Sequence, residues 1–253
     1  MEKNNYKISC YCPTYGRPKV LEEAIYSFLM LNYLNKELVI INDCKEQTLI
    51  FDHPQVKIFN YKERFDNFGI KFDTCVQHCT GDYITPWDDD DIYLPWKIEV
   101  SFKNMKNGIF HTSRGFAERS LKDLVYDKNV FHCNLMLEKN IYYELGGYPK
   151  ENKLTLDMEL INKIQKKYGN FSKDIPDEDL FYIYRWQTSN AVHLSSITTS
   201  KNETFQQVTE KLVLGNPNFV KGDIKLKPYW KYDYTKVSQD YVKNIKSASC
   251  KNP

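Results

Sequence analysis

Several features are scarce in this chain of 253 residues, and each excludes a class of protein. No apolar run approaches the ~18 residues that a membrane-spanning helix requires, so we expect no membrane span. The formal net charge is only +2, which is too small to indicate a nucleic-acid partner. Residues 1–7 are polar and lead directly into an apolar stretch, unlike a targeting segment. We therefore expect a soluble cytoplasmic protein.

Paired metal-binding cysteines are also missing. The chain has seven cysteines, an odd number, and no signal peptide, which favours reduced and buried thiols over a disulfide framework. Cys10 and Cys12 lie in an apolar stretch that has no matching Cys/His pair at zinc spacing. We interpret both as core residues.

What the sequence does contain is a repeated alternation of strand and helix patterns. Short apolar or β-branched stretches are separated by helical spacing, which predicts βαβ units and a mostly parallel sheet in one α/β domain. In the first part of the chain, we predict strands at residues 7–12, 37–41, 56–60, 82–87 and 109–113, and helices from residue 18, over 72–79 and over 96–105. Further along, we predict strands at 130–137 and 180–186, and helices at 138–145 and 155–168.

Four consecutive aspartates at residues 88–91 are the most informative local feature. Adjacent carboxylates repel one another and need positive charge. They follow a predicted strand, and in open α/β sheets ligands bind beyond the carboxyl ends of the strands. Oxygen ligands there suit Mg²⁺ or Mn²⁺ carrying a substrate phosphate. The competing interpretation is a solvated acidic turn that caps the next helix, which Pro95 would begin.

Four segments, in chain order, resemble the inverting glycosyltransferases of family 2, which have the type A nucleotide-sugar transferase fold. They correspond to the family's opening strand with its first turn and helix, its second strand, its metal motif, and its Gly-Gly-Tyr turn followed by a helix start. In this chain these are residues 8–27, 37–43, 81–95 and 146–160. Three residues depart from the family pattern: Gly16 replaces Asn, Asn42 replaces an acid and Cys44 replaces Gly.

The resemblance implies a single Rossmann-like type A glycosyltransferase domain with a mostly parallel central sheet and an extended C-terminal segment. We expect the domain at residues 1–200, with a nucleotide-binding half at 1–115 and an acceptor half at 116–200. Residues 201–253 are expected to form an arm that packs on the domain. Lysines and aromatic residues in this arm would also suit nucleic-acid binding, but interspersed acids favour packing.

The resemblance also implies a nucleotide-binding set at the ends of the first two strands. Turn residues there leave backbone groups and a hydroxyl free to hold a nucleobase, and Asp43 can accept a hydrogen bond from a uracil N–H. The alternatives are a turn acid for Asp43, a turn hydroxyl for Thr14, and an ion pair with Glu22 for Arg17. The expected nucleotide-binding residues are Pro13, Thr14, Tyr15, Arg17, Asp43, Asp88 and Asp89.

For the metal, the resemblance assigns Asp90 as a direct ligand and Asp88 as a contact to metal or ribose, while Asp91 caps or orients. His193 completes the metal shell in this interpretation, against the alternative of a structural histidine. The metal, Mn²⁺ or Mg²⁺, would neutralise the departing nucleoside diphosphate.

An inverting transfer also needs one carboxylate opposite the leaving group, which takes the proton of the acceptor hydroxyl. The resemblance gives this role to Asp157, although Leu156 stands where the family usually has Glu. The alternative for Asp157 is an acid in the first turn of a helix, where the helix dipole favours it.

The implied function is the metal-dependent transfer of a hexose, with glucose as an example, from a UDP-sugar to a hydroxyl of a glycan or glycosylated protein. One rival is a non-catalytic nucleotide-sugar-binding protein of the same fold, which would keep Asp43 and the acids but not need Asp157. Another is a two-metal phosphoesterase, which normally draws ligands, histidines among them, from several segments.

Overall fold

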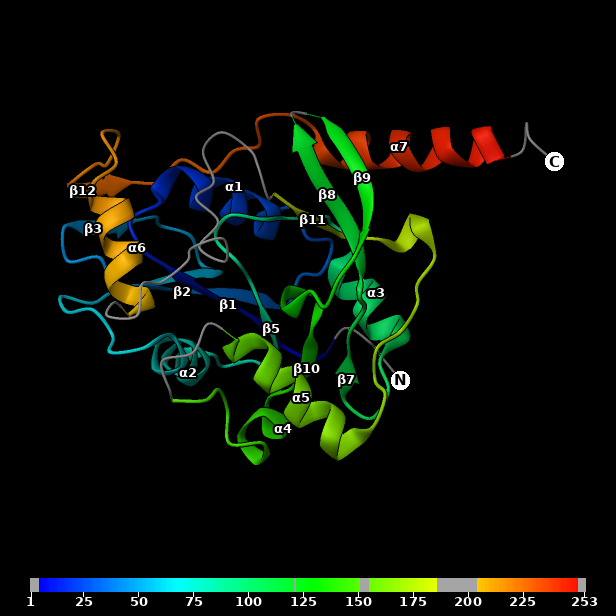
Figure 1. Cartoon of the computed structure of the whole chain (residues 1–253), viewed down its shortest axis with the longest axis horizontal. Helices are drawn as coiled ribbons and strands as arrows, with labels where there is room; N and C mark the ends of the chain where they lie inside the picture. Colours follow the sequence, from blue (N-terminus) through cyan, green and yellow to red (C-terminus); the bar gives the residue numbers. More distant parts are fainter. Residues whose placement is uncertain (1–4, 121, 151–154, 186–203, 250–253) are drawn as a thin grey trace.

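The computed structural model describes residues 5–120, 122–150, 155–185 and 204–249 (Figure 1). It is a mixed α/β fold around a central sheet with the strand order β4-β2-β1-β5-β10-β7. Neighbouring strands β4, β2, β1 and β5 are parallel, whereas β10 is antiparallel to β5 and β7. The predicted α/β class with a mostly parallel sheet is therefore confirmed. The strands are β1 (Ile8–Thr14), β2 (Lys36–Asn42), β4 (Val56–Asn60), β5 (Tyr83–Pro86), β7 (Ile109–Phe110) and β10 (Met136–Glu138).

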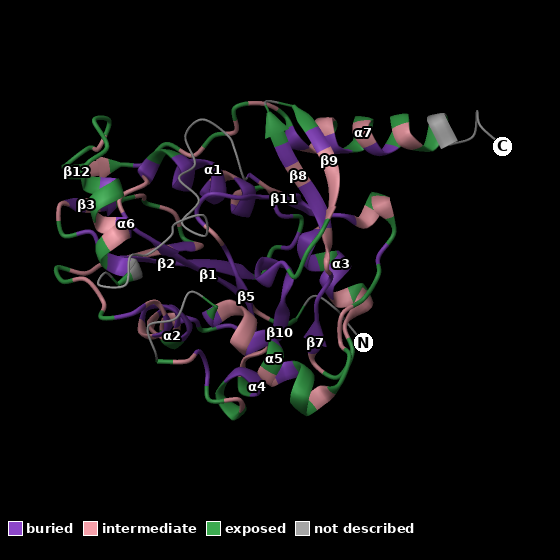
Figure 2. Ribbon diagram, viewed as in Figure 1, coloured by how far each residue is buried: buried purple, intermediate pink, exposed green. Residues whose placement is uncertain are grey.

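Both faces of this sheet are covered, which explains why its central strands are continuous apolar runs. Every residue of β1 and β2 is buried, as Figure 2 shows. Successive side chains point to opposite faces, so Cys10 and Cys12 pack with α1 and α3, and Tyr11 packs with α2 and α5. The helices are α1 (Pro18–Leu29), α2 (Phe68–His78), α3 (Lys97–Asn104), α4 (Lys139–Glu144) and α5 (Leu156–Tyr168).

A second sheet, with the order β6-β11-β8-β9, stands beside the first. The hairpin of β8 and β9 was missed from sequence, because charged residues interrupt its apolar ones and one of them, Glu118, is itself buried. The predicted strand at 130–137 is wrong: a 3-10 turn, η1 (His132–Asn134), precedes the short β10. The Asn134 amide donates to the carbonyls of Thr112 and Arg114, which holds the chain in that turn. The strands are β6 (Ile92–Tyr93), β8 (Arg114–Ser120), β9 (Asp123–Lys128) and β11 (Tyr182–Tyr184).

The C-terminal segment returns to the domain at several places. It contains α6 (Phe205–Leu214), β12 (Gly222–Lys225) and α7 (Tyr234–Ser249). Strand β12 pairs in parallel with β3 (Gln47–Ile50). The indole N–H of Trp230 donates to Ser27 in α1 at 3.0 Å, and the backbone N–H of Tyr126 donates to the Tyr241 hydroxyl at 3.1 Å. Among the described helices, none combines the length and apolar character needed to cross a bilayer.

Candidate functional site

The four aspartates form a turn between β5 and β6, and the turn is not solvated. Asp89, Asp90 and Asp91 are at most 5% exposed. Trp87, which precedes them, is fully buried and donates its indole N–H to the Ala24 carbonyl at 3.1 Å. Helix α3 begins after Trp96 without a side-chain cap. The interpretation of these acids as a solvated helix cap is therefore wrong.

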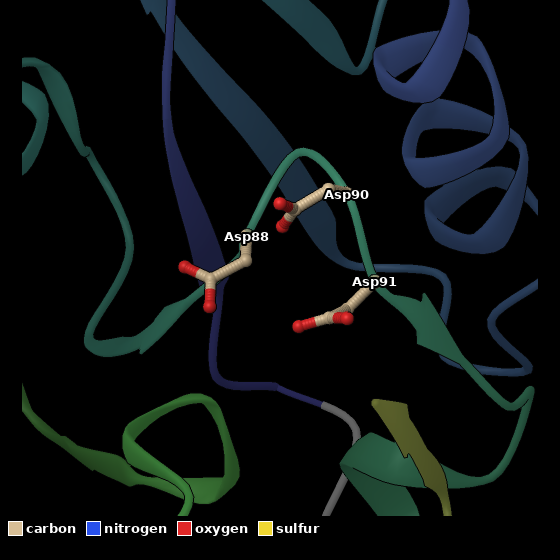
Figure 3. Close-up of side chains that lie close together, drawn as sticks. All are labelled: Asp88, Asp90 and Asp91. Atoms are coloured by element: carbon tan, nitrogen blue, oxygen red, sulfur yellow. The ribbon is translucent and has the colours of Figure 1, made fainter. Parts of the chain in front are cut away.

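Three of these carboxylates, those of Asp88, Asp90 and Asp91, gather on the turn (Figure 3). One oxygen from each lies within 4.8 Å of the others. Burial raises the pKa of Asp88 well above its ordinary value, and the neighbouring charges of Asp91 and Asp90 raise it further. A set of carboxylate oxygens under this repulsion fits Mg²⁺ or Mn²⁺.

The three carboxylates have different protein partners. Both oxygens of Asp91 accept hydrogen bonds, from the Tyr182 hydroxyl at 2.6 Å and from the backbone N–H of Arg185 at 2.9 Å. Asp88 accepts from the Cys133 thiol at 2.6 Å, and its backbone N–H donates to the Tyr93 hydroxyl at 2.7 Å. Asp91 thus anchors the turn to β11, while Asp88 faces η1.

Arg17 and Thr14 join the turn after β1 to the acidic turn. The Arg17 guanidinium pairs with Asp89 and, at 2.8 Å, with Asp90. The Thr14 hydroxyl donates to Asp89 at 2.5 Å. Asp89 is therefore held by protein partners, and its contact to the donor stays a prediction. The alternative pairing of Arg17 with Glu22 does not occur, because Glu22 pairs with Lys19 and accepts from the backbone N–H of Lys227.

Asp43 lies at the end of β2 and is joined to the same turn through Lys71. The Lys71 ammonium donates to Asp43 at 2.5 Å and to the Thr14 carbonyl at 2.6 Å. The other Asp43 oxygen accepts from the backbone N–H of Phe65 at 3.1 Å. Each carboxylate oxygen has a second lone pair, so Asp43 can still accept from a ligand. Sequence reasoning missed Lys71, although its place four residues before Cys75 puts it on the apolar face of α2.

Arg185 is a second buried cation that contacts the backbone of the acidic turn. It is 1% exposed, donates its Nε–H to the Asp90 carbonyl, and pairs with Glu23 of α1 at 3.1 Å. Removing one partner of such a buried pair leaves the other charge without compensation. The sequence gives no signal of this ion pair, because Glu23 is far from Arg185 in the chain.

Glu118 of β8, near Arg185, gives a prediction about stability. It is 1% exposed, and burial raises its pKa from 4.5 to about 7. Between these values the folded chain holds a proton that the unfolded chain has released, so stability falls as pH rises through this window, by at most about 3 kcal/mol. We expect Glu118→Gln to remove this loss, as urea unfolding at pH 5 and pH 8 would measure. The exposed Glu63→Gln is the matched control; equal pH dependence in all three chains would contradict the prediction.

Asp157 lies in the first turn of α5, as predicted. One carboxylate oxygen accepts from the backbone N–H of Met158 at 2.8 Å, and burial raises the pKa of Asp157. Helix α5 packs on η1, whose Cys133 contacts Asp88. Helix α5 therefore reaches the acidic turn only through η1. Among the hydrogen bonds and ion pairs of the described residues, Asp157 makes none with the carboxylates of that turn. His193 lies outside the described residues.

The fold and this site define a class: an α/β protein with a cluster of acids beyond the carboxyl ends of parallel strands. A model of the family described as Glycosyl transferase family 2 matches residues 9–156, from β1 to the start of α5. This is more than half of the chain. The chain therefore belongs to glycosyl transferase family 2.

The individual relatives share about a quarter of their residues with this chain over the aligned segments. The putative colanic acid biosynthesis glycosyl transferase WcaA of Escherichia coli K12 is 27% identical over 116 residues, covering 43% of this chain and 41% of WcaA. The UDP-Glc:alpha-D-GlcNAc-diphosphoundecaprenol beta-1,3-glucosyltransferase WfgD of Escherichia coli is 26% identical over 112 residues, covering 42% and 44%. The matches thus span less than half the length of these curated relatives.

Solved structures agree on the fold. Residues 1–349 of S. aureus TarS in complex with UDP-GlcNAc give a TM-score of 0.57 at 12% identity, over 77% of this chain and 62% of that one. The mannosyltransferase PcManGT from Pyrobaculum calidifontis in complex with GDP-Man and Mn²⁺ gives 0.52 at 14% identity, over 70% and 56%. At these identities the likeness shows a shared fold.

Proposed function

We propose that this chain is a metal-dependent inverting glycosyltransferase that moves a hexose from a UDP-sugar to a hydroxyl of a glycan or glycosylated protein. The observation that carries the proposal is the cluster of half-buried Asp88 with buried Asp90 and Asp91, linked through Asp89 and Arg17 to the turn after β1. Family membership supports the reaction type. The UDP-GlcNAc complex of TarS and the UDP-Glc in the name of WfgD support the donor class.

In this proposal, Asp88 and Asp90 hold Mn²⁺ or Mg²⁺, and the Mn²⁺ complex of PcManGT supports the choice of metal. The metal would supply positive charge for the diphosphate that leaves the sugar. Asp91 and Arg185 keep the turn in place through their buried hydrogen bonds. Pro13, Thr14, Tyr15 and Asp43 face the nucleoside.

Asp157 is the proposed general base. A carboxylate in a partly buried position has a raised pKa and is a better proton acceptor than an exposed one. It would take the proton of the acceptor hydroxyl as that oxygen attacks the anomeric carbon. The non-catalytic rival makes no use of this proton transfer, so Asp157 separates the two proposals.

The phosphoesterase alternative has less support. Within the described ranges, the carboxylate cluster comes from a single turn and contains no histidine, whereas two-metal sites need bridging ligands for ions ~3.5–4 Å apart. Hydrolysis and transfer assays against a panel of nucleotide sugars with Mn²⁺ would test the proposed function directly. Hydrolysis of simple phosphate esters without any sugar transfer would contradict it.

We expect Asp43→Asn to weaken UDP binding by about 10- to 100-fold and to reduce the preference for UDP over GDP. A hydrogen bond to a charged group contributes ~1.5–3 kcal/mol, and the variant loses that charge. Titration calorimetry with both nucleotides in the presence of Mn²⁺ measures the change, with the exposed Asp52→Asn as the control. Unchanged nucleotide selectivity would leave Asp43 only its structural pairing with Lys71.

A further inference from the structure

Helix α6 of the C-terminal segment packs directly on the turn that follows β1. Gly16 in that turn has a φ of +68°, and a Cβ built on it would collide with Val213 of α6. Val213 also forms a small apolar cluster with Tyr15 and Cys44, against which Phe219 packs. Gly16 and Cys44 are two of the residues that depart from the family pattern. Both departures therefore lie where α6 meets the nucleotide-binding turn.

Arg64 fixes α6 relative to Tyr15. Its guanidinium lies over the Tyr15 ring, 3.9 Å from the ring centroid. The same group donates to the backbone carbonyl of Gln206 at 2.6 Å and pairs with Glu210 at 3.6 Å. Through these contacts of Arg64, the first turns of α6 form a wall of the candidate site.

Gln206, on this wall, lines a narrow pocket together with Asp43, Lys71, Phe65 and Phe68. It is 8% exposed, and neither its amide nitrogen nor its amide oxygen has a hydrogen-bond partner in the described structure. Buried polar groups are nearly always paired, since an unpaired one is costly. In this structure the pocket has no room for a water molecule. The amide therefore requires a partner that neither the described protein nor solvent supplies there.

We propose that Gln206 recognises the nucleobase of the donor, an inference that rests on the proposed function. The imide edge of uracil carries an N–H beside a carbonyl oxygen. Asp43, in the same pocket, is expected to accept from the N–H, and the NH₂ of Gln206 can donate to the carbonyl beside it. The Phe65 and Phe68 side chains provide apolar contact for the ring. Because the pocket has no room for a water molecule in this structure, its lining side chains must move to admit the base.

The test compares Gln206→Ala and Gln206→Glu with the unchanged chain by titration calorimetry, using UDP and inorganic pyrophosphate, each with Mn²⁺. Gln206→Glu keeps the shape but removes the amide donor. We expect both variants to bind UDP about 3- to 10-fold more weakly, the range for one buried hydrogen bond. Pyrophosphate has no base, so its affinity is expected to stay unchanged. Gln239→Ala, an exposed glutamine in α7, is the matched control.

The inference would be overturned if the Gln206 variants bound UDP with unchanged affinity. It would also be overturned if they bound UDP more tightly, which would mean that Gln206 obstructs the pocket. An equal loss of affinity for pyrophosphate would overturn it as well, because that loss would reflect damaged packing of α6. Thermal melting of each variant reports such damage independently. If the unchanged chain binds no nucleoside diphosphate with Mn²⁺, the proposed function itself fails. If it binds UDP and the Gln206 variants bind equally well, only the role of Gln206 fails.

Discussion

Replacing Asp157 with asparagine is expected to slow sugar transfer by about 10²- to 10⁴-fold, the usual contribution of a general base. This corresponds to roughly 2.7–5.5 kcal/mol of activation free energy. Asparagine keeps the shape of the side chain but cannot accept the proton. Binding of UDP and Mn²⁺ is expected to survive, because Asp157 makes no hydrogen bond or ion pair with the acidic turn among the described residues.

The pH profile adds a second measurement to this experiment. Burial raises the pKa of Asp157, so the base becomes protonated, and transfer by the unchanged chain declines, at a higher pH than for an exposed aspartate. The Asn variant is expected to lose this dependence. Glu159→Gln, on the same helix, serves as the control. Transfer at the parental rate by Asp157→Asn would leave Asp157 as a first-turn acid, with Glu159 or Asp179 as the next candidates for the base.

Removing the metal is expected to have the second large effect. Without a divalent cation, the carboxylates of the acidic turn would face the diphosphate of UDP, so we expect Mn²⁺ to strengthen UDP binding by about 100-fold or more. Changes to groups that only support a metal ligand already cost 10- to 100-fold, and a direct ligand is expected to cost at least as much. Asp90→Asn is therefore expected to abolish most of this gain.

Titration calorimetry in EDTA and in Mn²⁺ measures the gain for each chain. Asp240→Asn, an exposed aspartate in α7, is the control for a simple loss of negative charge. Equal UDP affinity in EDTA and Mn²⁺ would contradict the metal-bridged site. A full Mn²⁺ effect in Asp90→Asn would contradict only the assignment of Asp90.

The parts of the fold that sequence predicted best are three parallel strands of the central sheet, two of them fully buried. Strands β1, β2 and β4 lie in continuous apolar runs between helices, and the predicted positions agree with the observed ones to within two residues at each end. The prediction missed β8 and β9, in which charged residues interrupt the apolar ones. It also missed α6, although Thr204 and Gln207 form a capping box that can be read from sequence.

The residues of the candidate site also fall into two groups, those that the sequence predicted and those that it did not. Asp88 to Asp91 are consecutive in sequence, and so are the residues of the turn at 13–17. Local motifs were therefore sufficient to select each segment. Lys71 and Arg185 were missed because their partners are distant in the chain: Lys71 pairs with Asp43, 28 residues away, and Arg185 contacts Asp91, 94 residues away. Gln206 was missed because only the packing of α6 brings it beside Asp43.

The sequence by itself determined the family, the α/β class and the acidic turn, because each depends on local patterns of apolar, turn and acidic residues. Only the tertiary structure decided which of these acids are buried and which already have protein partners. It also decided that α6 packs on the turn that follows β1, with Gly16 making room for Val213. The physical reason is that strands distant in sequence bring their carboxyl ends together only when they pair into a sheet. In the same way, a helix from the far end of the chain becomes a neighbour of these strand ends only when it packs on them.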